Sequence, residues 1–481
     1  MEVQAEVLEP LELRFADLLL LSSPSPSPSP SPFPDDADDL HRLQSLSSAV
    51  MRALGPSGPG LLSITAVPRA PALRRALLPL ARKLALLDNK DRARILKEHE
   101  LGSDVPLKNP DRNVSSFALQ LKFEQHAGLK LSCRGAENVD VGDDFGKECL
   151  NVCRSSDACD DGFKHLGNTF KELGHCMMEL GLMLARVCDN IIGDGELEDS
   201  LMGSGTAKGR LIHYHSMLDS IMLKDRSRKI KGGISKARVN ACSPLLCHRG
   251  EGSLSQVPME PCRMRSRTLG GNCCRASLSD LWQQWHYDYG IFTVLTGPMF
   301  LSSCQAGDCL CDSSDQECLS PSGHTYLQLF DSDKGKIYVV KCPPESFIIQ
   351  VGESADVLSR GKLCSALHSV GRPLELENLS RETFVVFLQP AWNKVLSFPD
   401  GLLEANHEKV WSGNVMPKSC DEDNVVSSAA LGSDKSNQLM QEILKIIPPL
   451  SSRLRDGMTF AEFSQETTKQ YYGGSGTQSQ R

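Results

Sequence analysis

The sequence lacks any apolar run long enough to cross a bilayer. Its early apolar segment, Leu18–Leu21, follows the acidic residues Glu12 and Asp17 instead of a basic start, and it is far too short to span a membrane. We therefore expect neither a signal peptide nor contact with a membrane. The expectation is a soluble protein of the cytoplasm, with the nucleus as an alternative.

An excess of positive charge is also lacking, since 52 Lys and Arg stand against 60 Asp and Glu, for a net charge of -8. This balance does not indicate a nucleic-acid-binding protein overall. The 18 cysteines have irregular spacing, and a long chain without an export signal favours reduced thiols. The cluster Cys304, Cys309, Cys311 and Cys318 lacks the paired C-x-x-C spacing typical of zinc sites, so we predict a loop with free thiols there.

The 481 residues, 40% of them hydrophobic, suffice for at least one sizeable core. Residues 22–34 alternate Ser with Pro and residues 35–39 are acidic, a composition that favours solvated chain, so we predict a disordered tether over residues 1–39. Residues 413–481 are predicted as a polar linker followed by helices. Thr459 and Glu462 form a capping box ahead of the last helix, which runs towards Tyr472.

A mainly helical region is predicted over residues 40–200. Apolar residues recur at helical spacing from Leu40 to Leu54 and from Leu73 to Leu87, with a short strand near residues 60–65 between them. Residues 100–162 lack a sustained period and are predicted as loops. A long helix between His165 and Ile192 carries one apolar stripe, formed by Phe170, Leu173, Met177, Leu180, Leu184 and Val187 or Cys188.

Short strands separated by Gly and Pro turns dominate residues 205–412. This succession predicts an α+β protein with an antiparallel sandwich or barrel instead of a parallel sheet. Two inserts, at about 217–280 and 302–322, interrupt the strands. The first is basic between Lys224 and Arg275 and is predicted to be disordered; a solvated loop is the simpler interpretation, and nucleic acid or an acidic protein is the alternative partner for its charge.

His286 and Asp288 stand two residues apart at the start of an apolar run that reaches Leu295. On a strand, residues i and i+2 point to the same face, so the imidazole and the carboxylate converge. A second imidazole, from His368 on a later strand, would complete the two-His-one-carboxylate set of non-haem Fe(II) oxygenases. Alternating polar residues on a solvated strand face are the plainer interpretation of His286 and Asp288.

Arg381 and Thr383 stand two apart on the following strand and therefore share a face. A guanidinium and a hydroxyl in this position are able to clamp a carboxylate through a charge-assisted pair. The plainer interpretation is a surface charge beside a residue that favours strands. As a pair that follows His368, they indicate a binding site for an organic acid.

These residues resemble a known family, the plant-type 2-oxoglutarate- and Fe(II)-dependent oxygenases of the isopenicillin N synthase-like group. The family's His-x-Asp, with Gly and an apolar run after it, is matched by His286, Asp288, Gly290 and the residues to Leu295. Later family motifs are answered in the same order by Val351-Gly352-Glu353, Val357–Gly361, Ser365–Val370 with His368, and Arg381, Thr383, Phe387 and Pro390.

The resemblance implies a double-stranded β-helix (jelly-roll) core over residues 205–412, with a helical N-terminal region and C-terminal helices. It also implies a metal site of His286, Asp288 and His368 for Fe(II), with Arg381, Thr383 and His215 binding 2-oxoglutarate. Dioxygen would be consumed, with ascorbate in support, and a small organic molecule would be hydroxylated, desaturated or demethylated with release of succinate and CO2.

Some residues depart from the family pattern. The strand that reads Asn-Tyr-Tyr-Pro in the family is matched here to His213-Tyr214-His215-Ser216. This match puts His215 at the position where a Tyr of the family faces the cosubstrate. In two other family motifs, Glu353 replaces Asp and Thr383 replaces Ser. Two alternatives therefore stay open: a binding or regulatory protein of the same fold with impaired turnover, and a zinc hydrolase, which would leave Arg381 and Thr383 unused. The substrate and the oligomeric state are not determined by the sequence.

Overall fold

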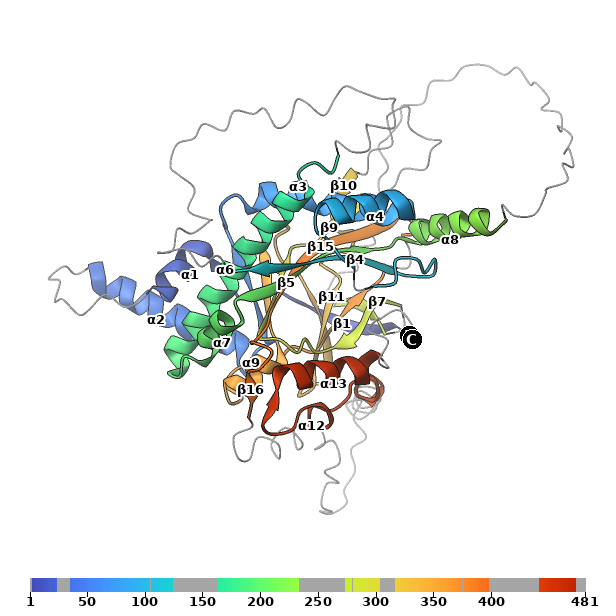
Figure 1. Cartoon of the computed structure of the whole chain (residues 1–481). Helices are drawn as coiled ribbons and strands as arrows, with labels where there is room; N and C mark the ends of the chain where they lie inside the picture. The colour runs from blue at the N-terminus through green and yellow to red at the C-terminus, as the bar shows by residue number, and fades with distance from the viewer. Residues whose placement is uncertain are drawn as a thin grey trace, which may run out of the picture.

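The computed structural model describes residues 2–23, 35–103, 105–123, 162–232, 273–278, 280–302, 316–373, 376–397 and 441–472. Two β-sheets form its centre, and helices cover them on opposite sides (Figure 1). This mixture of sheets and helices confirms the α+β class. None of the described helices combines the length and the apolar composition that a membrane crossing requires.

The first sheet has six strands. They are β1 (Glu2–Leu8), β6 (Cys273–Ser277), β7 (Leu281–His286), β11 (Leu327–Asp331), β12 (Lys336–Val340) and β14 (His368–Gly371). Their order is β6-β1-β12-β11-β14-β7. The β14–β7 pair is antiparallel and sets His368 directly opposite His286.

The second sheet has nine strands. They are β2 (Glu12–Arg14), β3 (Leu61–Thr65), β4 (Val114–Lys122), β5 (Thr206–Tyr214), β8 (Phe292–Thr296), β9 (Met299–Ser302), β10 (Gln316–Cys318), β13 (Phe347–Val351) and β15 (Leu379–Leu388). The order is β10-β9-β15-β8-β13-β3-β2, and β5 joins β15 to β4. The ten-residue strand β15 pairs with β5 along one edge and with β8 and β9 along the other.

Helices pack on the outer face of the nine-stranded sheet. They include α3 (Ala70–Leu86) and α6 (Leu166–Ile192), followed by α4 (Asn89–Glu98) and α7 (Glu196–Ser204). The predicted stripe of α6 is buried in the main core, together with residues of β8 and β15. Gly181 allows this close approach, because a Cβ there would lie 1.9 Å from a methyl group of Leu388. The prediction of the long helix is confirmed.

The N-terminal prediction is wrong over residues 2–22. This segment forms β1, β2 and α1 (Phe15–Ser22). Met1 and residues 24–34 of the predicted tether lie outside the described part. The acidic residues at its end begin α2 (Asp35–Leu54). β1 pairs in parallel with β12, and β2 pairs in parallel with β3, so the sheets are antiparallel with two parallel exceptions. The segment folds because Leu13, Phe15 and Leu18 enter the core.

Most of the other predicted elements are confirmed, and the errors have a common cause. The predicted strands near residues 61, 327, 336, 347, 368 and 383 are present, while β4 was missed within a supposed loop. The predicted disordered insert contains α8 (Met217–Gly232) and β6, and residues 233–272 lie outside the described part. β4 and β6 become strands because β5 and β1 supply their hydrogen bonds, which a local pattern does not reveal.

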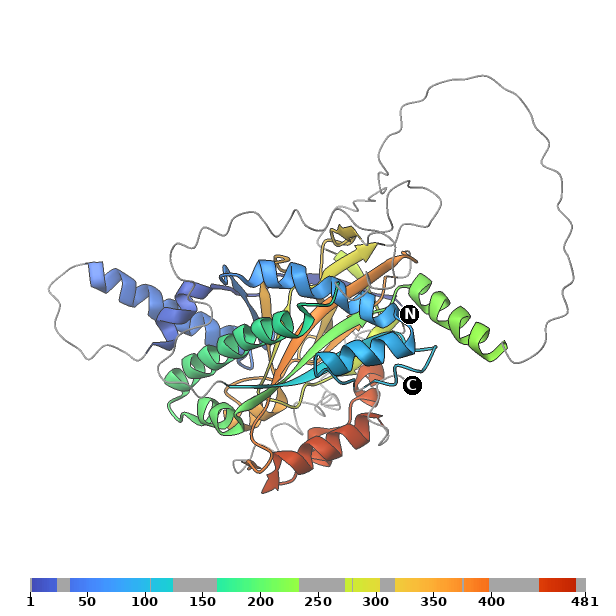
Figure 2. The same cartoon turned by 45° about the horizontal axis from the view of Figure 1, so that its top comes forward.

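The C-terminal helices α12 (Leu450–Arg453) and α13 (Phe460–Tyr472) lie across the sheets from α3 (Figure 2). The capping box is confirmed. The Thr459 hydroxyl accepts from the backbone N–H of Glu462, and the Glu462 carboxylate accepts from the backbone N–H of Thr459. Arg453 is buried and donates to both carboxylate oxygens of buried Glu353, at 2.7 and 2.5 Å. Glu353 begins α9 (Glu353–Leu358), so this ion pair joins the C-terminal helices to the sheets.

Replacing Arg453 by Ala is expected to lower the free energy of unfolding by about 3–5 kcal/mol, because it leaves the Glu353 carboxylate buried without its partner. Urea denaturation measures the effect. The exposed neighbour Arg455→Ala is the matched control, and an equal loss in the two variants would contradict the assignment.

Candidate metal centre

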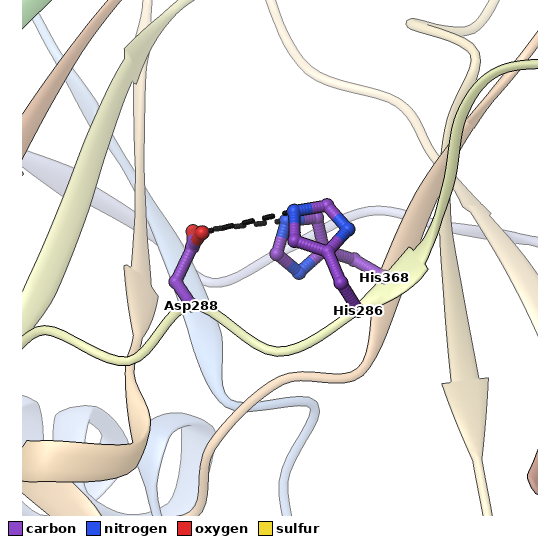
Figure 3. A group of neighbouring side chains, drawn as sticks. All are labelled: His286, Asp288 and His368. Carbon is purple, nitrogen blue, oxygen red and sulfur yellow. Dashed lines mark ion pairs between the residues drawn. The ribbon is translucent and has the colours of Figure 1, made fainter. Parts of the chain in front are cut away.

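Three side chains meet between the two sheets. One ligand atom from each of His286, Asp288 and His368 lies within 4.8 Å of the other two (Figure 3). The Nε2 atom of each histidine is 3.7 Å from an oxygen of Asp288, and the centroids of the two imidazole rings are 4.3 Å apart. The three predicted metal ligands are therefore brought together.

Backbone carbonyls fix which nitrogen of each imidazole faces the cluster. The Nδ1 atom of His286 lies 2.8 Å from the Gln284 carbonyl oxygen, and that of His368 lies 2.9 Å from the Ala366 carbonyl oxygen. A carbonyl oxygen only accepts, so each Nδ1 carries the proton and each Nε2 presents its lone pair. This arrangement of outer hydrogen bonds is typical of metal-binding histidines.

Asp288 lies just beyond the end of β7, so the shared strand face that the sequence suggested is not what aligns it with His286. The Thr293 hydroxyl donates to one Asp288 oxygen at 2.7 Å, and the Asp288 carbonyl oxygen accepts from the Glu353 backbone N–H at 2.8 Å. A Cβ on Gly352 would lie 2.3 Å from the Gly290 carbonyl oxygen and 3.0 Å from that of Asp288. The loop therefore keeps its position through contacts that only a glycine at 352 permits.

Burial, followed by the neighbouring His368, lowers the pKa of His286 to about 4. The His286 imidazole is therefore neutral at physiological pH, which is the form that binds a metal. Its Nε2 atom accepts a hydrogen bond from the Gln283 side-chain amide at 2.8 Å. Gln283 also accepts from the Tyr214 hydroxyl at 2.9 Å, so this side chain links the cluster to β5.

A cavity of about 250 Å³ opens beside the cluster. Both sheets supply its walls, and α13 contributes Thr467, Thr468 and Tyr471 at its edge. The Tyr471 hydroxyl accepts from the backbone N–H of Tyr287, a residue between the two ligands of the His-x-Asp motif. The C-terminal helix thus forms part of the site.

Arg381 lines this cavity and is 2% exposed. Its Nε donates to the Thr325 carbonyl oxygen at 3.0 Å, and its guanidinium stacks over the Tyr214 ring at 5.0 Å. Burial lowers the pKa of Arg381, although an arginine remains charged. The buried Nη1 atom has no hydrogen-bond partner among the described residues.

Thr383 is fully buried two residues further along β15. Its hydroxyl is 3.4 Å from the hydroxyl and from the carbonyl oxygen of Thr296. It lies between two cavity-lining residues, Arg381 and Val385, but is not itself part of the lining. A role for Thr383 in cosubstrate binding stays a prediction.

The structure places His215 away from the cavity, contrary to the prediction. His215 is fully buried, and its Nε2 pairs with the Ser115 hydroxyl at 2.9 Å on the other side of the sheet. The cavity-facing residue is Tyr214, whose pKa is raised by burial. A one-residue shift along a strand exchanges its two faces, so the cavity-facing position is the residue before His215.

His213 belongs to a separate buried network beneath α3 and α8. Its Nδ1 lies 2.9 Å from Glu382, its Nε2 lies 3.4 Å from Asp219, and Asp219 accepts from Arg82 at 2.7 Å. Burial alone would lower the pKa of His213, but the carboxylates of Glu382 and Asp219 raise it to about 9. Burial raises the pKa of Glu382, so at neutral pH the network keeps a proton between His213 and Glu382.

Comparison with known proteins gives solved structures only: no protein-family model matches the sequence, and no curated protein matches it. Similar structures include a full-length Neurospora crassa protein in complex with alpha-KG, at 15% identity and TM-score 0.42, covering 91% of this chain and 97% of that one. The dioxygenase for auxin oxidation from rice follows at 15% identity and TM-score 0.40, covering 82% and 87%. A 2OG-Fe(II) oxygenase family protein from Caulobacter crescentus has 13% identity and TM-score 0.38, covering 90% and 97%. The first of these neighbours binds alpha-KG, the second is a dioxygenase and the third belongs to the 2OG-Fe(II) oxygenases. At these identities and TM-scores the likeness does not assign a function to the chain.

Several residues of the site escaped the sequence analysis. Gln283 and Thr293 hold the ligands, Tyr214 supports Arg381, and the cations Lys208 and Arg210 line the cavity. Gln283, three residues before His286, and Thr293, five after Asp288, flank the motif but match no spacing rule. Lys208, Arg210 and Tyr214 occupy alternate positions along β5 and therefore share one strand face. This alternation is the sequence signal from which their common position in the cavity could have been predicted.

Gly352→Ala is expected to weaken binding of Mn(II) or Fe(II) about 10- to 100-fold, because its Cβ displaces the loop that holds Asp288. A metal titration of the purified protein measures the effect. Gly203→Ala is the matched control, since a Cβ there meets no atom within 4 Å. Unchanged metal affinity in Gly352→Ala would contradict the role given to this close contact.

The raised pKa of His213 predicts a stability that depends on pH. The contribution of the protonated His213 to the free energy of unfolding is fully present below pH 6.5, the ordinary pKa of histidine. It is lost as the pH rises through 9, because the folded state then releases the proton that the network stabilised. The advantage of wild type over His213→Gln in unfolding free energy should therefore decrease by about 3 kcal/mol between pH 6.5 and 10. Urea titrations measure it, with exposed His41→Gln as control; a difference that does not vary with pH would count against the charged network.

Proposed function

We propose that this protein is a 2-oxoglutarate- and Fe(II)-dependent dioxygenase that oxidises a small organic molecule with release of succinate and CO2. The observation that carries the proposal is the convergence of His286, Asp288 and His368 in a cavity that buried Arg381 also lines. Two imidazoles and one carboxylate are the ligand set of non-haem Fe(II) oxygenases. A zinc hydrolase would need the same ligands but would give Arg381 no role.

The ligand residues fit Fe(II). Both Nε2 atoms present lone pairs, and the lowered pKa of His286 keeps protons from competing for its nitrogen. Three ligands on one side of an ion leave positions open for an organic acid and for dioxygen. When bound, the iron supplies the dioxygen chemistry that protein side chains lack.

The surroundings of Arg381 fit the far carboxylate of 2-oxoglutarate. A buried donor without a partner costs about 1–3 kcal/mol, and a carboxylate accepting from Nη1 would remove that cost. Stacking on Tyr214 and the hydrogen bond to the Thr325 carbonyl oxygen hold the guanidinium in one orientation. Arg381 therefore binds and orients the cosubstrate, and the hydroxyl of Thr383 lies next along the same strand.

The other residues of the site position groups and exclude water. The Thr293 hydroxyl donates to Oδ2 of Asp288, the oxygen nearest His368, and so holds the carboxylate with Oδ1 towards His286. Gln283 must give up its hydrogen bond to His286 Nε2 when a metal binds there. Thr467, Thr468 and Tyr471 of α13 cover the cavity edge and limit the entry of water.

We further propose that the two sheets form the double-stranded β-helix, or jelly-roll, of the oxygenases. Support comes from the antiparallel β7–β14 and β8–β13 pairs and from the cavity that both sheets line. The alternative, a binding protein with impaired turnover, was favoured by the unusual His213–His215 strand and by the two inserts. Since both histidines face away from the cavity and Tyr214 faces it, the first of these two reasons no longer applies.

With Fe(II), ascorbate and 2-oxoglutarate, the purified protein is expected to form succinate slowly in the absence of a substrate. His286→Ala and Asp288→Ala should abolish succinate formation by removing metal ligands, whereas Arg381→Met should raise the KM for 2-oxoglutarate at least tenfold because a charge-assisted pair is lost. His41→Ala, at an exposed histidine, is the control. Succinate formation that survives in His286→Ala and Asp288→Ala would exclude the proposed site.

A further inference from the structure

Contacts from the C-terminal helices hold the chain on both sides of Asp288. The two histidine ligands belong to β7 and β14, whereas Asp288 lies beyond the end of β7. The Tyr287 backbone N–H donates to the Tyr471 hydroxyl at 3.3 Å, and the ring centroids of Tyr289 and Phe460 are 5.9 Å apart. Helix α13 therefore contacts the residue immediately before the carboxylate ligand and the residue immediately after it.

A third contact reaches Asp288 through α9. The backbone N–H groups of Glu353 and Ser354 donate to the carbonyl oxygens of Asp288 and Gly290, at 2.8 and 3.0 Å. The carboxylate of the same Glu353 accepts two hydrogen bonds from Arg453 of α12. Arg453 therefore holds the residue whose backbone holds Asp288.

Arg453 also joins the two C-terminal helices to each other. It donates to the Thr467 hydroxyl at 3.2 Å, and its guanidinium lies over the Tyr471 ring, 5.3 Å from the centroid. Arg453 and Glu353 are 1% and 2% exposed, so water does not compete for their contacts. Since the ion pair carries no net charge, we expect it to act on the metal site through the position of Asp288.

Helix α13 also faces the cavity. It runs along one side of the two sheets (Figure 1), and Thr467, Thr468 and Tyr471 line the cavity together with the three proposed ligands. A metal site keeps its affinity only while its ligands stay within about 0.5 Å of the binding geometry. Loss of the packed α13 would remove the support of Asp288 and part of the cavity wall at the same time.

Resting on the function proposed above, we propose that Arg453 and Tyr471 are positioning residues for Asp288, so that packing of the C-terminal helices and binding of the metal stabilise each other. Neither side chain is a ligand itself. The coupling is reciprocal: the factor by which the packed helices raise the metal affinity is the factor by which the metal favours the packed helices. The metal site is therefore complete only when the C-terminal helices are in place.

Metal affinity tests the first half of the coupling. The full-length protein is titrated with Mn(II) without 2-oxoglutarate, so that binding is measured and not turnover. Tyr471→Phe, which removes one hydroxyl, should weaken Mn(II) binding about tenfold, and Arg453→Met should weaken it about 10- to 100-fold, as is usual when an outer partner of a metal ligand is lost. Arg453→Lys keeps the charge without the bidentate contact, so its affinity should lie between those of wild type and Arg453→Met.

Gln470→Ala is the matched control. The Gln470 amide donates to the Ser452 carbonyl oxygen at 2.9 Å and to the Glu466 carboxylate at 2.8 Å, so it supports the same pair of helices away from Asp288. This variant should keep the wild-type affinity for Mn(II). Hydrogen exchange measures the second half of the coupling: saturating Mn(II) should slow exchange of the backbone amides of α13 in wild type but not in Asp288→Ala.

Three results would overturn the inference: unchanged Mn(II) affinity in folded Tyr471→Phe or Arg453→Met, an equal loss in Gln470→Ala, or exchange in α13 that does not respond to Mn(II). If Arg453→Met does not fold, Tyr471→Phe decides, because it removes a single oxygen and keeps the ring beneath Arg453. Failure of the wild-type protein to bind either Mn(II) or Fe(II) would instead refute the proposed function.

Discussion

The antiparallel pairing of β7 with β14 is the constraint on which the site depends. It places His286 and His368 opposite each other, and the carbonyl oxygens of Gln284 and Ala366 then turn both Nε2 atoms towards Asp288. Strand register cannot change by one residue without moving every side chain to the other face. The positions of the two imidazoles are therefore set by the sheet, and the loop contacts of Thr293 and Gly352 place Asp288 beside them.

The same sheet geometry connects the ligand cluster to the rest of the chain. β15 and β5 carry Arg381 and Arg210 on one wall of the cavity, so one strand pair presents two cations at separate places. The buried pair of Arg453 and Glu353 holds the C-terminal helices against the loop of Asp288, because the Glu353 backbone N–H donates to the Asp288 carbonyl oxygen. Loss of either partner would leave an unpaired buried charge, which makes this arrangement specific to a single packing of the chain.

The sequence was informative wherever the signal was local. His286, Asp288 and His368 stand in short motifs, and the long helix at residues 166–192 has a clear apolar period, so both could be predicted. β1 could not, because its hydrogen bonds come from β12 and β6, which lie far along the chain, and composition alone suggested a tether. His215 was misplaced for a different reason: on a strand, a comparison that is one residue out of frame selects the wrong face, and the cavity residue is Tyr214.

The most direct test of the proposed metal and cosubstrate site is equilibrium binding of labelled 2-oxoglutarate to the purified protein under anaerobic conditions, with and without Fe(II). If His286, Asp288 and His368 hold the metal beside Arg381, the cosubstrate should bind at one site per chain, and removing the metal should weaken that binding at least tenfold. Arg381→Met should weaken binding even when Fe(II) is present. Binding that is indifferent to Fe(II), or absent under both conditions, would contradict the proposed site.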